Sequence, residues 1–386
     1  MSRYRALASL ALALAAALPL AAQDATDWPQ FRGGPGQRGL ANHELPSALA
    51  LSWTFKTEGA ITSSPVISGD RVFIGSRDGK CYCVALATGT KRWEVALKSE
   101  IEASPVIVEL AQGRLVVVGD TEGNLVALDP AAGAERWRFK AGDKICGAAA
   151  PFTSKGEVRL VVGSYDNCLH CLDATSGKEL WNYATGSYIN GSPALTSIDG
   201  HAVAVIGGCD AHLHVVDLED GTSLRSIEMS AYVAASAAVD GTLAWVGDYG
   251  NEVACIDLKE GKVKWRFEER KFPYFSSPAV GDSLVVIGTR DRHVCAFDRA
   301  TGAERWAFEA QGNVDGSPII GGTRVAVGSD DGHLYLLDLA TGKQLWSYEI
   351  GGKIGGSPAV SGGMLVTGCE DGSLYAFSAK EPAHGK

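Results

Sequence analysis

Short hydrophobic runs, separated at regular intervals by glycine and aspartate, extend through most of the chain. One clear set covers residues 317–320, 324–328, 333–338 and 344–348. Runs of this length bounded by Gly and Asp predict β-strands. The pair Asp331-Gly332 suits a tight turn between the second and third of these strands, because glycine adopts positive φ at little cost. The pattern predicts an all-β protein made of four-stranded units.

The same unit recurs eight times along the chain, with a period of 40 to 44 residues. Its clearest copy contains Ser317-Pro318, Gly328, Asp331-Gly332, Asp338, Gly342 and Trp346. A period of this size, made of short strands, is typical of a β-propeller with one four-stranded sheet per repeat. We therefore expect an eight-bladed β-propeller of four-stranded antiparallel blades over residues 51–378.

A tryptophan recurs at one position of the repeat, where we expect it to dock between neighbouring blades. Arg225 takes this position in the fourth unit, and the eighth unit stops near Phe377 without a tryptophan of its own. Residues 51–57 should therefore supply the outer strand of the last blade, which closes the ring and removes open sheet edges. The expected docking residues are Trp53, Trp93, Trp137, Trp181, Trp265, Trp306 and Trp346.

The two ends of the chain do not carry the repeat. Arg3 and Arg5 precede an apolar run over residues 6–18 and small residues at 20–22, which predicts a secretory signal peptide over residues 1–22. Residues 23–50 then form a leader segment and residues 379–386 a tail. The first cysteine is Cys81, so we expect an exported protein, periplasmic or extracellular, that is not lipid-anchored. We expect no transmembrane segment and a monomer.

Charge and cysteine content narrow the range of partners. The formal net charge of −10 disfavours nucleic acid and anionic lipid. Three of the nine cysteines, Cys83, Cys171 and Cys255, stand where other repeats have alanine, which indicates buried thiols. Two pairs in neighbouring blades, Cys168 with Cys209 and Cys81 with Cys369, could form disulfides.

The repeat motif resembles that of a known family. The segments 127–129 through Gly133 to Trp137, and 171–173 through Gly177 to Trp181, are similar to the tryptophan-docking motif of the quinoprotein propellers. Residues 27–33 resemble the leader before many bacterial PQQ-like repeat proteins. The resemblance implies either a pyrroloquinoline-quinone (PQQ) alcohol dehydrogenase or a non-catalytic, BamB-like propeller of outer-membrane β-barrel assembly. Departures from the motif are Ala85 for Asp, Arg225 for Trp, and Ala149 and Ala237 for Pro.

The residues that the dehydrogenases use have no match in the sequence. That family stacks its quinone between a tryptophan and adjacent cysteines and holds Ca²⁺ with carboxylates and an amide. Here no two cysteines are adjacent, Trp245 is expected in a strand core, and Trp28 lies outside the repeats. We therefore expect no catalytic residue and no cofactor.

One histidine cluster has metal-ligand spacing. Asp210, His212 and His214 alternate along one predicted strand, so two imidazoles could face a metal ion. However, His170 and His214 occupy the repeat position that Tyr82, Tyr335 and Tyr375 fill elsewhere. Packing explains this position, and we expect no metal site.

Residues at the start of each innermost strand should surround the channel mouth, where they vary most between repeats. A ligand-binding mouth and a solvent-lined pore both fit this mixture. The segment around Phe272 adds aromatic residues beside arginine, a combination typical of interface anchors. Candidate partner-binding residues are Glu100, Glu102, Lys144, Tyr188, Asn190, Tyr232, Arg270, Phe272, Tyr274, Phe275, Asn313, Asp315 and Lys353.

Three neighbouring repeats have a longer first hairpin, around residues 108–113, 153–157 and 197–201. These hairpins fit either a docking surface on the opposite face or neutral drift in length. Taken together, the sequence predicts an exported, non-catalytic propeller that binds protein or peptide partners, with a role in envelope assembly implied by the resemblance. The alternatives are a PQQ-dependent dehydrogenase and a carbohydrate-binding propeller.

Overall fold

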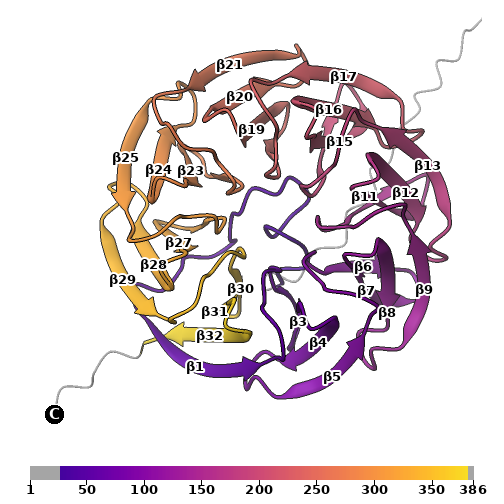
Figure 1. Ribbon diagram of the computed structural model, residues 1–386, viewed down its shortest axis with the longest axis horizontal. Helices are drawn as coiled ribbons and strands as arrows, with labels where there is room; N and C mark the ends of the chain where they lie inside the picture. Colours follow the sequence, from indigo (N-terminus) through magenta and orange to yellow (C-terminus); the bar gives the residue numbers. More distant parts are fainter. Residues whose placement is uncertain (1–26, 381–386) are drawn as a thin grey trace, which may run out of the picture.

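The computed structural model describes residues 27–380 and contains eight four-stranded antiparallel sheets arranged in a ring (Figure 1). The predicted eight-bladed propeller is confirmed. The predicted signal peptide and residues 381–386 of the predicted tail lie outside the described residues. Residues 27–380 contain no helix, and so none that could cross a membrane.

Each blade runs from an innermost strand at the channel to an outermost strand at the rim of the ring. Blades 1 and 2 contain β2 (Val66–Ser68), β3 (Arg71–Gly75), β4 (Lys80–Ala85), β5 (Lys91–Ala96), β6 (Val106–Leu110), β7 (Gly113–Gly119), β8 (Asn124–Leu128) and β9 (Glu135–Lys140). Blades 3 and 4 contain β10 (Ala150–Ser154), β11 (Glu157–Gly163), β12 (Cys168–Asp173), β13 (Glu179–Ala184), β14 (Ala194–Ile198), β15 (His201–Gly207), β16 (His212–Asp217) and β17 (Ser223–Glu228).

The second half of the ring repeats this order. Blades 5 and 6 contain β18 (Ala238–Asp240), β19 (Leu243–Gly247), β20 (Val253–Asp257), β21 (Lys262–Phe267), β22 (Ala279–Val280), β23 (Leu284–Gly288), β24 (His293–Asp298) and β25 (Glu304–Glu309). Blades 7 and 8 contain β26 (Ile319–Gly321), β27 (Arg324–Gly328), β28 (His333–Asp338), β29 (Gln344–Glu349), β30 (Ala359–Ser361), β31 (Met364–Gly368), β32 (Ser373–Ala379) and β1 (Leu49–Lys56).

The ring is closed by the first strand of the chain. β1 pairs antiparallel with β32, with Trp53 opposite Ala376, and in Figure 1 the indigo strand lies beside the yellow one. This closure, predicted from the spacing of Trp53, is confirmed. It gives the last blade its fourth strand, so the outer edge of β32 is paired within the molecule.

Tryptophans on the outer strands join each blade to the next. Five of them donate an indole N–H to a backbone carbonyl of the following blade, at distances of 2.7 to 3.0 Å: Trp53 to Leu86, Trp93 to Pro130, Trp137 to Ala174, Trp265 to Arg299 and Trp306 to Leu339. Trp181 packs against Gly221 of the next blade, although its indole N–H lacks a partner among the described groups. Trp346 packs against Tyr348 and Phe377 instead.

A belt of serine hydroxyls joins the blades at the channel. The backbone N–H of Ser192 donates to the hydroxyl of Ser236, and that of Ser236 donates to Ser277, at 2.8 and 3.1 Å. Six of the eight blade junctions have this bond among the described residues. The recurring Ser-Pro step therefore has a structural role: the serine hydroxyl accepts the neighbour's amide, and the proline after it needs no partner.

The leader crosses one end of the channel (Figure 1). Its carbonyl groups accept backbone N–H bonds from the innermost strands of six blades, and the side chain of Arg32 is buried among them. We call this end the leader face, and the opposite end, where the innermost strands begin, the mouth.

Candidate functional site: the channel mouth

A cavity of about 180 Å³ opens at the mouth, along the axis of the ring. All eight blades contribute to its wall, and Phe31 of the leader lines it from the other side. The wall includes Glu102, Asn190, Phe275 and Asp315, which the sequence predicted to surround the channel. The structure therefore brings together residues that lie up to 213 positions apart in the chain.

Ion pairs fix the charged side chains of this wall. Arg290 donates two hydrogen bonds to Asp315, from Nε at 2.9 Å and from Nη2 at 2.8 Å. The same guanidinium lies 3.5 Å from the centre of the Phe275 ring, a cation–π geometry. On the other side of the channel, Arg77 contacts Glu102 at 2.7 Å. Both carboxylates are thus neutralised within the molecule.

The charged residues at the edge of blades 7, 8 and 2 are held less tightly. Lys353 contacts Asp330 at 3.3 Å, and Glu100 lies 3.9 Å from Arg77. Burial and the neighbouring Asp315 raise the pKa of Asp330. Asn313 contributes its backbone carbonyl, which accepts the N–H of Asp330 at 2.8 Å.

Aromatic side chains gather on the other half of the mouth. The rings of Tyr165 and Tyr188 stack with their centres 4.9 Å apart, and the ammonium group of Lys144 lies 4.8 Å from the centre of Tyr165. The Tyr165 hydroxyl donates to Oδ1 of Asn190 at 2.6 Å. These contacts orient the stack, and Tyr188 remains about half exposed to solvent.

Four aromatic residues at this half of the mouth are exposed. Tyr188, Tyr232, Tyr249 and Phe272 have exposed fractions of 48%, 55%, 46% and 49%, and we call them the aromatic arc. They are four of the seven large hydrophobic residues that are exposed within residues 27–380. The rings of Tyr232 and Tyr249 are 6.3 Å apart, and Tyr249 meets Phe275 edge to face at 4.9 Å. The arc therefore extends over three neighbouring blades, 4 to 6.

Two predicted partner-binding residues do not lie where the sequence placed them. The expectation that Tyr274 is an exposed anchor is wrong, because its side chain is fully buried against Gly247. It fills the interblade position that Ile101 and Val314 occupy elsewhere. Arg270 is also not a free rim cation, because it pairs with Asp291 at 2.7 Å and Glu304 at 3.0 Å.

A second set of mouth residues was missed by the sequence analysis. Each lies two positions after the glycine that ends the second strand of a blade, and most of their backbone N–H groups bond to the carbonyl of a predicted mouth residue. The constant spacing from that glycine is a signal that could have found them. They include Arg77, Tyr165, Tyr249, Arg290, Asp330 and Glu370.

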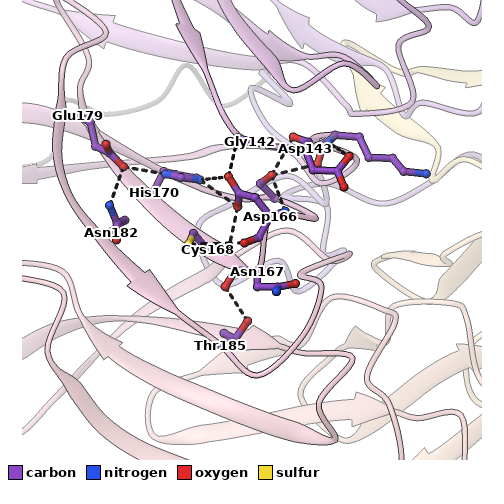
Figure 2. A network of polar contacts seen from close by, with 11 residues as sticks. Gly142, Asp143, Asp166, Asn167, Cys168, His170, Glu179, Asn182 and Thr185 are labelled. Carbon is purple, nitrogen blue, oxygen red and sulfur yellow. Dashed lines mark hydrogen bonds and ion pairs between the residues drawn. The ribbon is translucent and has the colours of Figure 1, made fainter.

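Asp166, Cys168 and His170 form the cluster with metal-ligand residue types, in blade 3 (Figure 2). Nε2 of His170 lies 3.0 Å from Asp166, and Nδ1 lies 2.8 Å from Glu179. Asp166 also accepts the backbone N–H groups of Gly142 and Cys168. Tyr82 and Tyr335 make the same bond to Asp78 and Asp331 in their blades. The cluster is a variant of a repeated turn-stabilising contact.

The strand of blade 4 with the predicted histidine cluster contains the same histidine–aspartate contact. Nε2 of His214 lies 3.0 Å from Asp210, and the Tyr183 hydroxyl lies 3.0 Å from Nδ1. Both nitrogens of the ring are therefore engaged within the protein. This arrangement matches the packing explanation offered from the repeat position.

The mouth does not fit a quinone with its calcium ion. Glu102, Asn190 and Asp315 are the residue types that bind Ca²⁺, but Glu102 and Asp315 are paired with arginines and Asn190 accepts from Tyr165. No tryptophan lines the cavity formed by the described residues. The one thiol in its wall is Cys146, and burial, with Glu102 nearby, raises its pKa to about 12.

All nine cysteines lie within the described residues, and all are free thiols. Cys83, Cys171 and Cys255 are buried, as expected from their alanine-equivalent position. The two possible disulfides, between Cys168 and Cys209 and between Cys81 and Cys369, are not formed.

Two solved structures with this fold are proteins of different kinds. Over 87% of this chain and 99% of the other, the fold matches BamB from Moraxella catarrhalis, with a TM-score of 0.70 and 22% identity. It also matches the quinohemoprotein alcohol dehydrogenase from Comamonas testosteroni over 94% of this chain and 82% of the other, with a TM-score of 0.76 and 14% identity. At these identities the likeness concerns the fold alone.

Sequence comparison gives a clearer result. A curated polyvinylalcohol dehydrogenase from Sphingopyxis sp. (strain 113P3) is 34% identical over 65 residues, which is 17% of this chain and only 10% of that protein. The family model described as outer membrane protein assembly factor BamB matches residues 49–120, 107–232, 210–318 and 294–382. These segments together span nearly the whole propeller, and the chain belongs to this family.

Proposed function

We propose that this protein is an exported, non-catalytic scaffold that binds a protein or peptide partner through the channel mouth. Membership of the BamB-like family supports a role in the assembly of outer-membrane proteins. The signal peptide predicted over residues 1–22 supports export. The proposal concerns the partner-binding surface first and the assembly role second.

The aromatic arc is the observation that carries the proposal. Exposed tyrosine and phenylalanine side chains are enriched where proteins bind one another, because each buries a large area at a small cost in rotamer entropy. Here they are concentrated on one surface, beside the side chain of Lys144. Large hydrophobic side chains gathered in this way on a soluble propeller mark an interaction surface.

The charged half of the mouth is suited to orienting a partner. Arg77, Lys353 and Arg290 pair with Glu100, Asp330 and Asp315, respectively, at this end of the channel. Charges of both signs at the edge of an interface contribute more to specificity than to affinity. A partner would therefore be anchored by the aromatic arc and oriented by these side chains.

A quinone-dependent dehydrogenase is the alternative, and the matched segment of polyvinylalcohol dehydrogenase supports it. Two observations disfavour it. The carboxylates of Glu102 and Asp315 are already paired with arginines. The raised pKa of Cys146 keeps its thiol protonated. Purified protein incubated with PQQ and Ca²⁺ should show no dye-coupled alcohol oxidation. Stoichiometric quinone binding with turnover would overturn the proposal.

Partner binding is tested by co-purification from envelope extracts of the native host, with quantification of each recovered protein. The double variant Tyr232→Ser/Phe272→Ser removes two exposed rings from the arc and should lose most of the specific partner. Leu180→Ser/Leu345→Ser is the matched control, because these leucines are each 43% exposed on outer strands. Equal recovery with both double variants would contradict the proposal.

A further inference from the structure

The leader face has a repeated hydrogen-bond pattern with one gap. One position recurs in every blade, two residues after the Pro (or Ala) of the Ser-Pro step, and in six blades its backbone N–H donates to the leader. Six of these amides bond to leader carbonyls at 2.7 to 2.9 Å: Ile67 to Trp28, Ile107 to Pro29, Leu195 to Pro35, Val239 to Gly36, Val280 to Arg38 and Ile320 to Gly39. The remaining positions are Pro151 in blade 3, which has no N–H, and Val360 in blade 8.

The backbone N–H of Val360 is the one in this pattern that has no acceptor among the described residues. Val360 is opposite Leu365 in the β30–β31 pair, as Ile320 is opposite Val325 in the β26–β27 pair. The equivalent register directs this N–H towards the leader, but no described group accepts it. Val360 is only 2% exposed. A buried backbone N–H without an acceptor is costly and rare, and it usually marks a place where water or a ligand binds.

Arg32 supplies a second, independent observation on the same face. Its guanidinium is 1% exposed and donates to the carbonyls of Pro278, Pro318 and Gln37 and to the Ser357 hydroxyl. All four acceptors are neutral, and no described carboxylate lies within 4.0 Å of it. Burial lowers the pKa of Arg32 to about 9. A buried cation without a counter-ion is unfavourable unless an anion comes to it.

Arg32 and Val360 both line one cavity. This cavity, of about 390 Å³, is lined by Arg32, Val360 and the glycine-rich part of the leader. Two acidic residues of the wall already have partners: Asp240 pairs with Arg38 and Arg299, and Asp27 accepts from Ser68 and the N–H of Gly69. Arg32 is the arginine of this wall without an ionic partner among the described residues, because the other, Arg38, pairs with Asp240.

We propose that the leader-face cavity is an anion site that takes a carboxylate group, bound by the N–H of Val360 and the positive charge of Arg32. A carboxylate matches this pair because one oxygen accepts from the amide and the negative charge balances the guanidinium. The carboxylate belongs either to a small organic acid or to the C-terminus of a peptide. The site is separate from the mouth and does not depend on what binds there.

The test uses protein labelled with ¹⁵N-valine and titrated with acetate at constant ionic strength. The Val360→Pro variant identifies the Val360 signal by its disappearance, and Pro151 shows that this position of a blade accommodates proline. The Val360 amide signal should shift saturably with acetate and not with acetamide, which has the same shape without the charge. Val280 is the internal control, because its N–H is already bonded to Arg38.

Two further variants and one further probe complete the test. Val360→Pro should weaken acetate binding about tenfold, the value of one charge-assisted hydrogen bond, without loss of thermal stability. Arg32→Gln should weaken it at least as much, if it folds. Tri-alanine that binds more tightly than its C-terminal amide would assign the site to peptide C-termini, and tri-alanine that fails to bind would assign it to small acids. A Val360 signal that ignores acetate, or responds equally to acetamide, would overturn the proposal.

Discussion

The indole Nε1 of Trp53 donates a 2.7 Å hydrogen bond to the carbonyl oxygen of Leu86, and this bond joins the last blade of the ring to the first. Trp53 lies on β1, so the same residue also belongs to the strand that completes blade 8. We predict that Trp53→Ala lowers the free energy of unfolding by about 3–5 kcal/mol, because it removes a buried aromatic side chain and its bond. Urea denaturation followed by circular dichroism measures this loss.

Trp346→Ala is the control for this prediction. Trp346 is partly exposed and donates no indole hydrogen bond within the described residues. Its substitution should cost clearly less than that of Trp53. An unchanged midpoint for Trp53→Ala would show that closure through this residue does not stabilise the ring.

The glycine turns that receive the tryptophans give a second prediction. A Cβ added to Gly302 would lie 2.5 Å from the ring of Trp265, whereas one added to Gly261 would lie 3.5 Å from Arg225, which replaces tryptophan there. Both glycines have positive φ, of 75° and 66°, so backbone strain of about 1–2 kcal/mol is common to both. Gly302→Ala should destabilise the protein more than Gly261→Ala in thermal unfolding. Equal losses would mean that contact with the indole is unimportant.

The serine belt gives a prediction of increased stability. Blade 3 has Ala148 where Ser104 and Ser192 stand in its neighbours, and Ala148 borders the channel cavity, where a hydroxyl has room. Ala148→Ser should supply the acceptor missing for the N–H of Ser104 and raise the free energy of unfolding by about 0.5–1.5 kcal/mol. Ser192→Ala, which deletes an existing bond, should lower it by a similar amount. The prediction fails if Ala148→Ser has no effect while Ser192→Ala is destabilising.

Stability should depend on pH through His214. Burial lowers the pKa of His214 below 6.5, despite the contact with Asp210. Below pH 6.5 the unfolded chain therefore binds a proton that the folded protein takes up only at lower pH, so stability falls as the pH is lowered through this range. His214→Tyr places at this position the residue that Tyr82 and Tyr335 supply elsewhere, with the same bond to aspartate. Melting temperatures between pH 8 and 5 should decrease less in the variant, and parallel profiles would contradict this.

The fold was predictable because the same pattern of four short strands and turn residues recurs eight times in the sequence. Ring closure by Trp53 followed from spacing alone, and the seventh unit's strands were predicted almost to the residue, except that β26 begins at Ile319 because Ser317-Pro318 serves the belt. Tyr274 shows how the candidate site was misread. Its position in the repeat is that of Ile101, but the neighbouring aromatic residues suggested exposure, and only Phe272 is exposed.

The leader could not be placed from the sequence. Arg32 bonds to Pro278 and Pro318, which are 246 and 286 residues away, and its acceptors are backbone carbonyls that any residue provides. Such contacts leave no pattern in side-chain chemistry. The gap at Val360 is visible only when the eight blades are compared in space.

The central claim, that a partner protein binds at the aromatic arc, is tested most directly by photo-crosslinking in cells of the native host. The photoreactive amino acid p-benzoylphenylalanine is placed at Tyr232, 55% exposed in the arc, or at Leu345, 43% exposed on the outer strand β29. The account predicts a discrete crosslinked product from position 232 that is absent from position 345 and is reduced by Phe272→Ser. The absence of a crosslink at 232, or the same product from both positions, would contradict it.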